Sequence, residues 1–127
     1  MLRDSQISAY VPVSDVKKGR QFYEGVLDQQ PRRVGDDGVL YECANHSQFF
    51  MYLSPGAGTS KASCAFWSVE DVEKEVDELK ERGVSFERYD VPGLSMEGDI
   101  ATGGGAKSAW FKDPDGNILA LIQVIDA

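Results

Sequence analysis

Alternation of apolar and polar residues along the chain predicts its β-strands. Between residues 6 and 13 every second residue, from Ile7 to Val13, is apolar, so these side chains would share one face of a strand and Tyr10 would lie on the other. Residues 28–54 hold two or three further extended runs, broken by turn-forming residues. Four more strands are predicted at residues 62–69, 84–89, 107–112 and 117–125, the last two as a hairpin.

Apolar residues at helical spacing predict two helices, each directly after a strand. The first begins at Ser14-Asp15, whose side-chain oxygens can accept hydrogen bonds from the free N–H groups of a first turn, and it extends over about three turns to Leu27. The second begins at Glu70-Asp71 and ends before Gly83, a residue suited to the left-handed conformation at a helix C-terminus.

The two predicted helix starts lie in a repeated segment. Residues 13–18 and 69–74 share Val, Asp, Val and Lys, and each matching pair is 56 residues apart, as Val13 and Val69 are. The repeat falls at the same strand-to-helix junction in both halves, which predicts a duplicated β-α-β-β-β unit. We therefore expect an α+β fold with two paired βαβββ modules, residues 5–54 and 61–125, which are joined by a linker at 55–60 into one domain spanning 1–127.

Composition narrows the class of protein. A chain of 127 residues has the length of one domain, and its net charge of −8 disfavours nucleic acid as a partner. No apolar run is long enough to span a membrane, and the first residues lack the apolar stretch of a secretion signal. The two cysteines, Cys43 and Cys64, are expected to be reduced, so we expect a cytoplasmic protein without membrane partners.

Two segments together are similar to a known family. The first comprises residues 10–15 with Phe22-Tyr23-Glu24 and Val26-Leu27, and the second extends from Trp110 to Leu119. They resemble the first strand and helix and the last hairpin of the vicinal oxygen chelate superfamily, which includes glyoxalases, bleomycin resistance proteins and dioxygenases. The resemblance covers residues 6–125. It implies that the paired modules form a cupped mixed β-sheet with helices on its outer face, and that the protein is a homodimer.

The resemblance also identifies the positions of four metal ligands on the inner face of such a cup. In this chain those positions are occupied by Ser8, Tyr52, Cys64 and Ala120. Metal-dependent members would carry His or Glu there. A divalent cation needs several oxygen, nitrogen or sulfur donors, and this set supplies at most one competent ligand. We therefore expect no bound metal and no cofactor, and the metal-dependent activities of the family are in doubt.

Other candidate motifs have simpler interpretations. His46 is the only histidine and could be a general base, although a polar turn residue is the commoner role. Cys64 could be a nucleophile or a small buried residue. The pattern Asp113-x-Asp115-x-Asn117 lacks the glycine and glutamate of an EF-hand loop. Gly103-Gly104-Gly105, within the loop 90–105, is interpreted as a flexible lid or hinge.

Aromatic residues supply the main functional hypothesis. By alternation several rings project to the face that carries ligand positions in relatives, and Trp110 resembles a pocket position of the family. The expected ligand-binding residues are Ser8, Tyr10, Phe50, Tyr52, Cys64, Phe66, Trp110, Ile118 and Ala120. We expect a metal-free protein, more a binder than an enzyme, that holds a small organic molecule, planar or cationic. The alternatives are a metal-dependent lyase or dioxygenase that recruits Glu42 or His46, and a dimeric scaffold with a filled cup.

Overall fold

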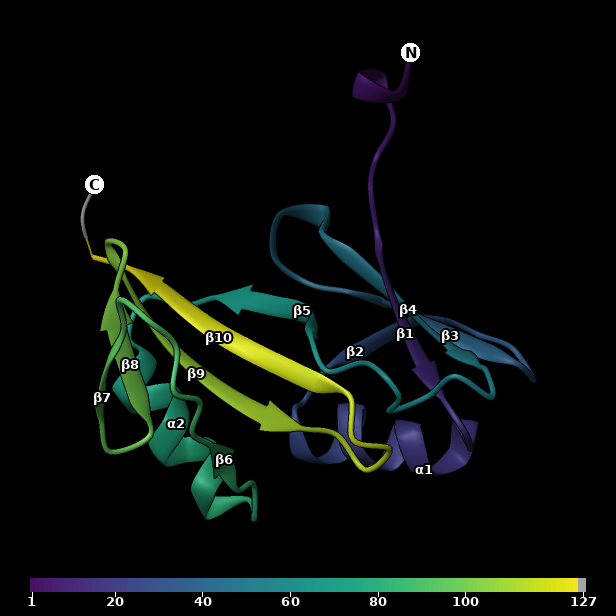
Figure 1. The fold of residues 1–127 in the computed structure, drawn as a ribbon. Coiled ribbons are helices and arrows are strands. Elements are labelled where there is room, and N and C mark those ends of the chain that lie inside the picture. The colour runs from purple at the N-terminus through teal and green to yellow at the C-terminus, as the bar shows by residue number, and fades with distance from the viewer. Residues whose placement is uncertain (126–127) are drawn as a thin grey trace. The chain divides into compact units, whose positions relative to one another are not determined.

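A computed structural model describes residues 1–125 of the chain, which fall into two compact units. Unit 1 comprises Met1–Ser60 together with the turn Pro114–Asn117, and unit 2 comprises Lys61–Asp113 together with the chain from Ile118 onward. Each unit contains one mixed β-sheet with a helix on one face, so the expected α+β class is confirmed (Figure 1). None of the helices described in residues 1–125 has the length and apolar character needed to cross a membrane.

Unit 1 has the strand-helix-three-strand order predicted for a module. Its strands form a sheet in the order β1-β4-β3-β2, in which β1 and β4 are parallel and the other pairs antiparallel. The main elements are β1 (Ala9–Val13), α1 (Val16–Arg20), β2 (Gln30–Val34), β3 (Gly38–Glu42) and β4 (Gln48–Leu53). Helix α1 continues as a π-helical segment, Gln21–Val26, and short 3-10 turns occupy Leu2–Asp4 and Ala44–His46.

The helix of unit 1 packs on one face of the sheet, where alternate residues of β1 and β4 are buried. Val11 and Val13 of β1 are almost completely buried, as alternation predicts. Tyr23 from the helix and Tyr41 from β3 are also fully buried. The helix can approach closely because Gly19 has no side chain: a Cβ there would lie 2.6 Å from Met51 Sδ.

A network of polar side chains lies beside the buried residues of unit 1. Arg20 Nε donates to Glu24 Oε2 at 2.6 Å, and the Tyr41 hydroxyl donates to the same oxygen at 2.9 Å. These hydrogen bonds satisfy the phenol of a ring whose burial would otherwise be unfavourable. The hydrogen bond from Arg20 also holds the pKa of Glu24 below its usual value.

Unit 2 repeats the plan with two extra strands. Its sheet has the order β5-β10-β9-β8-β7, β6 pairs with β9, and the first strand is again parallel to the last. Its elements are β5 (Ser63–Ser68), α2 (Val72–Glu81), β6 (Phe86–Glu87), β7 (Ser95–Glu97), β8 (Ile100–Gly103), β9 (Ala106–Lys112) and β10 (Ile118–Val124). This common topology supports the duplication inferred from the 56-residue repeat.

Helix α2 lies against the sheet of unit 2. Asp71 caps it by accepting from Lys74 N at 3.2 Å, and Gln123 Oε1 accepts from Val72 N at 2.9 Å. Val72 and Val76 are the buried residues of the helix. On the sheet beneath, the Trp67 ring stacks on the fully buried Phe111 ring, with centroids 6.4 Å apart.

The turn between β9 and β10 belongs to unit 1. Asn117 is 5% exposed, accepts from Gly58 N at 3.0 Å and donates to Pro12 O at 2.6 Å. Asp115 accepts hydrogen bonds from both the backbone N and the hydroxyl of Ser14. Asp115 and Asn117 therefore have a structural role: they hold the turn to the end of β1 and to the 55–60 segment.

Several predicted boundaries are wrong in detail. Ile7 lies before β1 and is 93% exposed, because the strand begins only at Ala9. The run predicted at 84–89 forms a strand only at Phe86–Glu87. Residues 90–105 are not one open loop, because β7 and β8 form an antiparallel pair within them and Gly104 and Gly105 make the turn into β9. Between β6 and β9 the longest stretch without helix or strand is 88–94, since the turns at 98–99 and 104–105 hold two residues each.

Candidate functional site

The sheet face of unit 1 opposite its helix carries the first half of the predicted site. In the parallel register of β1 and β4, Tyr10 pairs with Phe50 and Pro12 with Tyr52, so these side chains share a face. The Tyr10 ring meets the Phe50 ring edge-on with centroids 5.9 Å apart, and its centroid lies 4.3 Å from that of Tyr52. Tyr10 is nevertheless 65% exposed, so this cluster is a surface rather than a core.

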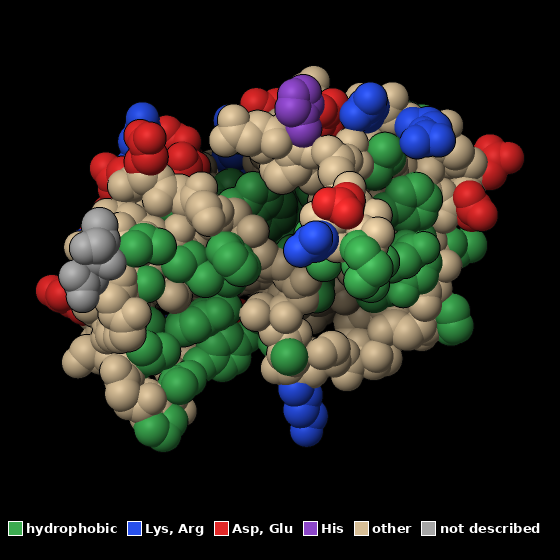
Figure 2. Space-filling view, turned by 90° about the horizontal axis from the view of Figure 1, so that it is seen from above, with side chains coloured by type: hydrophobic (Ala, Val, Ile, Leu, Met, Phe, Trp, Pro, Cys, Tyr) green, Lys and Arg blue, Asp and Glu red, His purple; other side chains and the backbone are tan. Residues whose placement is uncertain are grey.

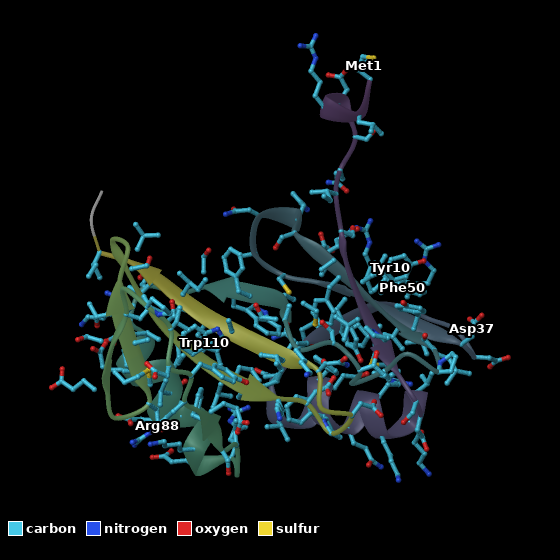
Figure 3. The ribbon with its side chains drawn as sticks, viewed as in Figure 1. Met1, Tyr10, Asp37, Phe50, Arg88 and Trp110 are labelled. Atoms are coloured by element: carbon cyan, nitrogen blue, oxygen red, sulfur yellow. The ribbon has the colours of Figure 1, made fainter. Side chains whose placement is uncertain are left out.

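A cavity of about 600 Å³ lies over this face of unit 1. Tyr10, Phe50 and Leu40, which pair in one row across β1, β4 and β3, line it. Polar side chains at its edges include Ser8, Gln48 and the oppositely charged Arg33 and Asp37. Figure 3 shows Tyr10 and Phe50 side by side and Asp37 beyond them at the start of β3. Apolar walls with a few polar groups are typical of small-molecule sites.

Gly38 has a special place in this cavity. It lines the wall, and a Cβ there would lie 2.5 Å from Phe50 Cζ. Any larger residue would therefore displace the Phe50 ring, so glycine at this point of β3 leaves room for the ring.

The corresponding face of unit 2 carries the second half of the predicted site. Ala120 pairs with Phe66 on one side and with Trp110 on the other, so the three residues form one row across β5, β10 and β9. Ile118 and Ala120 are buried, whereas Phe66 is 59% exposed. Figure 2 shows hydrophobic side chains, in green, gathered at the surface.

A second cavity, of about 410 Å³, lies within unit 2. Trp110 and Ile118 line it, as does Tyr89, whose ring meets the Trp110 ring edge-on with centroids 5.4 Å apart. Polar side chains from Lys61, Ser63 and Asp90 complete the lining. Tyr89 was not among the residues expected from the sequence. No local sequence signal identifies it, because its place follows from the pairing of β6 with β9, in which Glu87 lies opposite Trp110.

The predicted residues therefore separate into three groups. Ser8, Tyr10 and Phe50 line the cavity of unit 1, and Trp110 and Ile118 line the cavity of unit 2. The remaining four share the faces of these residues without lining either cavity; they are Tyr52, Cys64, Phe66 and Ala120. That the two halves face one another in a single cup stays a prediction.

The residues at the family's metal positions do not fit a divalent cation. Ala120 has no donor atom, and Ser8 and Tyr52 offer neutral hydroxyls. Burial, and then the charge of Asp113, raise the pKa of the Cys64 thiol, which disfavours the thiolate needed for a ligand or a nucleophile. Across residues 1–125, no three His, Cys, Asp or Glu side chains are grouped closely enough to hold a metal ion.

His46 has a partner that the sequence did not reveal. Its Nδ1 lies 2.9 Å from Glu42 Oε1, and Arg32 Nη1 lies 3.5 Å from the other carboxylate oxygen. The contact with His46 holds the pKa of Glu42 below its usual value. The histidine side chain is 81% exposed and lines neither cavity, as its place at the surface in Figure 2 shows. This arrangement is that of a surface pair at a turn.

Comparison with known proteins supports the same fold. The bleomycin resistance determinant encoded on transposon Tn5 is 22% identical, with a TM-score of 0.70 over 94% of this chain and 97% of that chain. TnmS3, an antibiotic binding protein from Streptomyces sp. CB03234, is 22% identical, with a TM-score of 0.68 over 94% of this chain and 96% of that one. A glyoxalase/bleomycin resistance protein from Catenulispora acidiphila is 20% identical, with a TM-score of 0.69 over 94% and 97%.

The match to a family model shows which family the chain belongs to. None of the curated proteins matches the chain. The model described as Glyoxalase/Bleomycin resistance protein/Dioxygenase superfamily, however, matches residues 6–121, almost the whole sequence. The chain therefore belongs to the Glyoxalase/Bleomycin resistance protein/Dioxygenase superfamily.

Proposed function

We propose that this protein binds a small organic molecule, without a metal ion, on the aromatic faces of its two sheets. The observation that carries the proposal is the cavity of about 600 Å³ lined by Tyr10, Phe50 and Leu40. Rings left largely exposed on a sheet face are unfavourable in water, and a ligand that covers them removes apolar surface from solvent. The size of the cavity matches that of ordinary small-molecule sites.

The side chains around the rings indicate what kind of molecule fits. Edge-on and stacked contacts with Tyr10 and Phe50 favour a planar ring system. Arg33 and Asp37 both line the cavity, so a ligand could pair with either charge. The net charge of −8 would attract a cation to the molecule as a whole, and cation–π contacts with the rings would hold it.

The names of two structural relatives support a binding function. One is an antibiotic binding protein, and the other is a bleomycin resistance determinant. The residues at the four metal positions also lack the donors that a metal-dependent reaction would need. These points favour binding or sequestration over catalysis. We further propose that the protein works as a cytoplasmic homodimer.

The test is native mass spectrometry and metal analysis of protein purified from cells, together with ligand titration of variants. We expect an organic adduct and no stoichiometric divalent ion. Tyr10→Ala removes a ring from the wall of the unit 1 cavity and should weaken binding by about 1–3 kcal/mol. The fold should stay intact, because the Tyr10 side chain is 65% exposed. Trp67→Ala is the control, because Trp67 stacks on the buried Phe111 ring and should affect stability instead.

Other outcomes would replace the proposal. A stoichiometric metal, with an activity lost on chelation, would favour a metal-dependent lyase or dioxygenase that uses Glu42 and His46. Absence of any adduct, with unchanged spectra on addition of planar aromatic compounds, would favour a scaffold with a filled cup.

A further inference from the structure

The Tyr89 hydroxyl is a buried polar group that lacks a hydrogen-bond partner. Among residues 1–125 it is the one buried side-chain oxygen or nitrogen in this condition. The hydroxyl of Tyr41, in contrast, donates to Glu24 at 2.9 Å. Buried polar groups in folded proteins are almost always paired, because leaving one unpaired costs about 1–3 kcal/mol. An exception on a cavity wall therefore calls for an explanation.

The location of Tyr89 provides one. It lines the cavity of unit 2 with Trp110, and the two rings meet edge-on at 73°. The segment 88–94 that contains it has neither helix nor strand, and Asp90 and Val91 from that segment line the same cavity. Irregular segments of this kind move more readily than strands, so a small shift can bring a ligand atom to the hydroxyl.

The protonation state of Tyr89 determines what it can bind. Burial, and then the negative charge of Glu87, raise the pKa of the Tyr89 phenol, and the nearby Lys112 opposes this only in part. The group therefore stays protonated near neutral pH, and it can donate a hydrogen bond. Its natural partner is an oxygen that accepts one.

We propose that Tyr89 Oη donates a hydrogen bond to a carbonyl or ether oxygen of a planar ligand that lies against Trp110 in the cavity of unit 2. This inference rests on the proposed function. It adds the chemical class of the ligand and the residue that recognises the oxygen of that ligand. The apolar face of the ligand would contact Trp110 and Ile118, and its oxygen would replace the missing partner of Tyr89.

Two matched probes test the proposal. Coumarin and naphthalene have the same fused two-ring shape, but only coumarin carries a carbonyl oxygen. Binding is followed by the Trp110 indole signal in ¹H–¹⁵N correlation spectra, which a Trp67→Phe background isolates because the chain has two tryptophans. We expect coumarin to bind more tightly than naphthalene. Tyr89→Phe should weaken coumarin about 5- to 10-fold, the value of one neutral hydrogen bond, and leave naphthalene unchanged.

Thermal unfolding of the ligand-free protein is an independent readout. Tyr89→Phe removes an unpaired hydroxyl, so its melting temperature should equal or exceed that of the parent. Tyr41→Phe is the matched control: it removes a paired hydroxyl in unit 1, so it should lower the melting temperature and leave coumarin binding unchanged.

The outcomes separate the inference from the proposed function. If Tyr89→Phe weakens both probes equally or neither, the donor role of Tyr89 is wrong, while the shift of the Trp110 signal still supports a binding cavity. A lower melting temperature for Tyr89→Phe would show that the hydroxyl has a structural partner. If neither probe moves the Trp110 signal, the site in unit 2 is overturned, and native mass spectrometry still tests binding on unit 1.

Discussion

At the scale of single residues, strand position decides what an aromatic side chain does in this protein. Tyr41 points to the helix, is fully buried and has a paired hydroxyl. Tyr10, on the opposite face of the same sheet, is 65% exposed and lines a cavity. Because neighbouring residues of a strand point to opposite faces, one tyrosine packs in the core and a chemically identical one lines a cavity.

Glu24 makes folding stability depend on pH. The hydrogen bond from Arg20 keeps the pKa of Glu24 lower in the folded protein than in the unfolded chain. Its contribution to stability is therefore present above the ordinary glutamate pKa of about 4.3, and it is lost as pH falls through the folded value. We expect Glu24→Gln to be less stable than the parent at neutral pH, with a difference that shrinks on acidification.

Urea unfolding measured between about pH 7 and pH 3 tests this expectation. Glu78→Gln, which changes an exposed carboxylate on α2, is the control and should follow the parent at every pH. A stability difference for Glu24→Gln that stays constant over this range would contradict a stabilising role for the Arg20–Glu24 contact.

At the scale of elements, local patterns predicted most of the fold. Both helices and the order of elements along unit 1 follow from apolar periodicity and the 56-residue repeat. Alternation also predicts the shared face of Tyr10, Phe50 and Tyr52. The register of β1 and β4 keeps these alternate residues on one face of the sheet. The function of these residues in binding stays a prediction.

Features that depend on distant partners could not be predicted in this way. Tyr89 lies beyond the two-residue strand β6, and its place beside Trp110 depends on the pairing of β6 with β9. The hydrogen bond of Asn117 joins residues 105 positions apart. The periodicity of a local segment does not predict such a contact, because the contact forms only when separate segments pack together.

Asn117 is the clearest test at this scale. Asn117→Ala removes a buried amide and, with it, the hydrogen bonds to Gly58 N and Pro12 O. We expect the free energy of unfolding to fall by about 1–3 kcal/mol, measured by urea denaturation. Asp36→Ala, in the exposed turn before β3, is the control and should change it by less than about 0.5 kcal/mol. A neutral Asn117→Ala would mean that the turn contributes nothing to unit 1.

At the scale of the whole molecule, the homodimer is the main prediction. In each sheet the first strand, β1 or β5, stands at one end of the strand order. The segment before β1 extends away from the sheet of unit 1 toward Met1 (Figures 1 and 3), and its residues Leu2 and Ile7 are 88% and 93% exposed. Apolar side chains exposed to this degree on an extended segment are well suited to contact a second copy.

Light scattering of the purified protein tests the dimer. We expect a mass twice the 14.0 kDa of one chain. The double variant Leu2→Ser and Ile7→Ser should dissociate at higher concentration than the parent if the segment contacts the second copy. A parent mass of one chain at all concentrations would contradict the prediction.

The turn Pro114–Asn117 has a consequence for how such genes can recombine. A crossover near residue 60 that replaced the second half by that of another superfamily member would also exchange part of unit 1, because the turn is carried by the later half. Only donors with an acceptor at position 115 and an amide at position 117 could restore the bonds to Ser14, Gly58 and Pro12. Although the two halves share a topology, exchange of the second half alone would therefore alter the packing of the first.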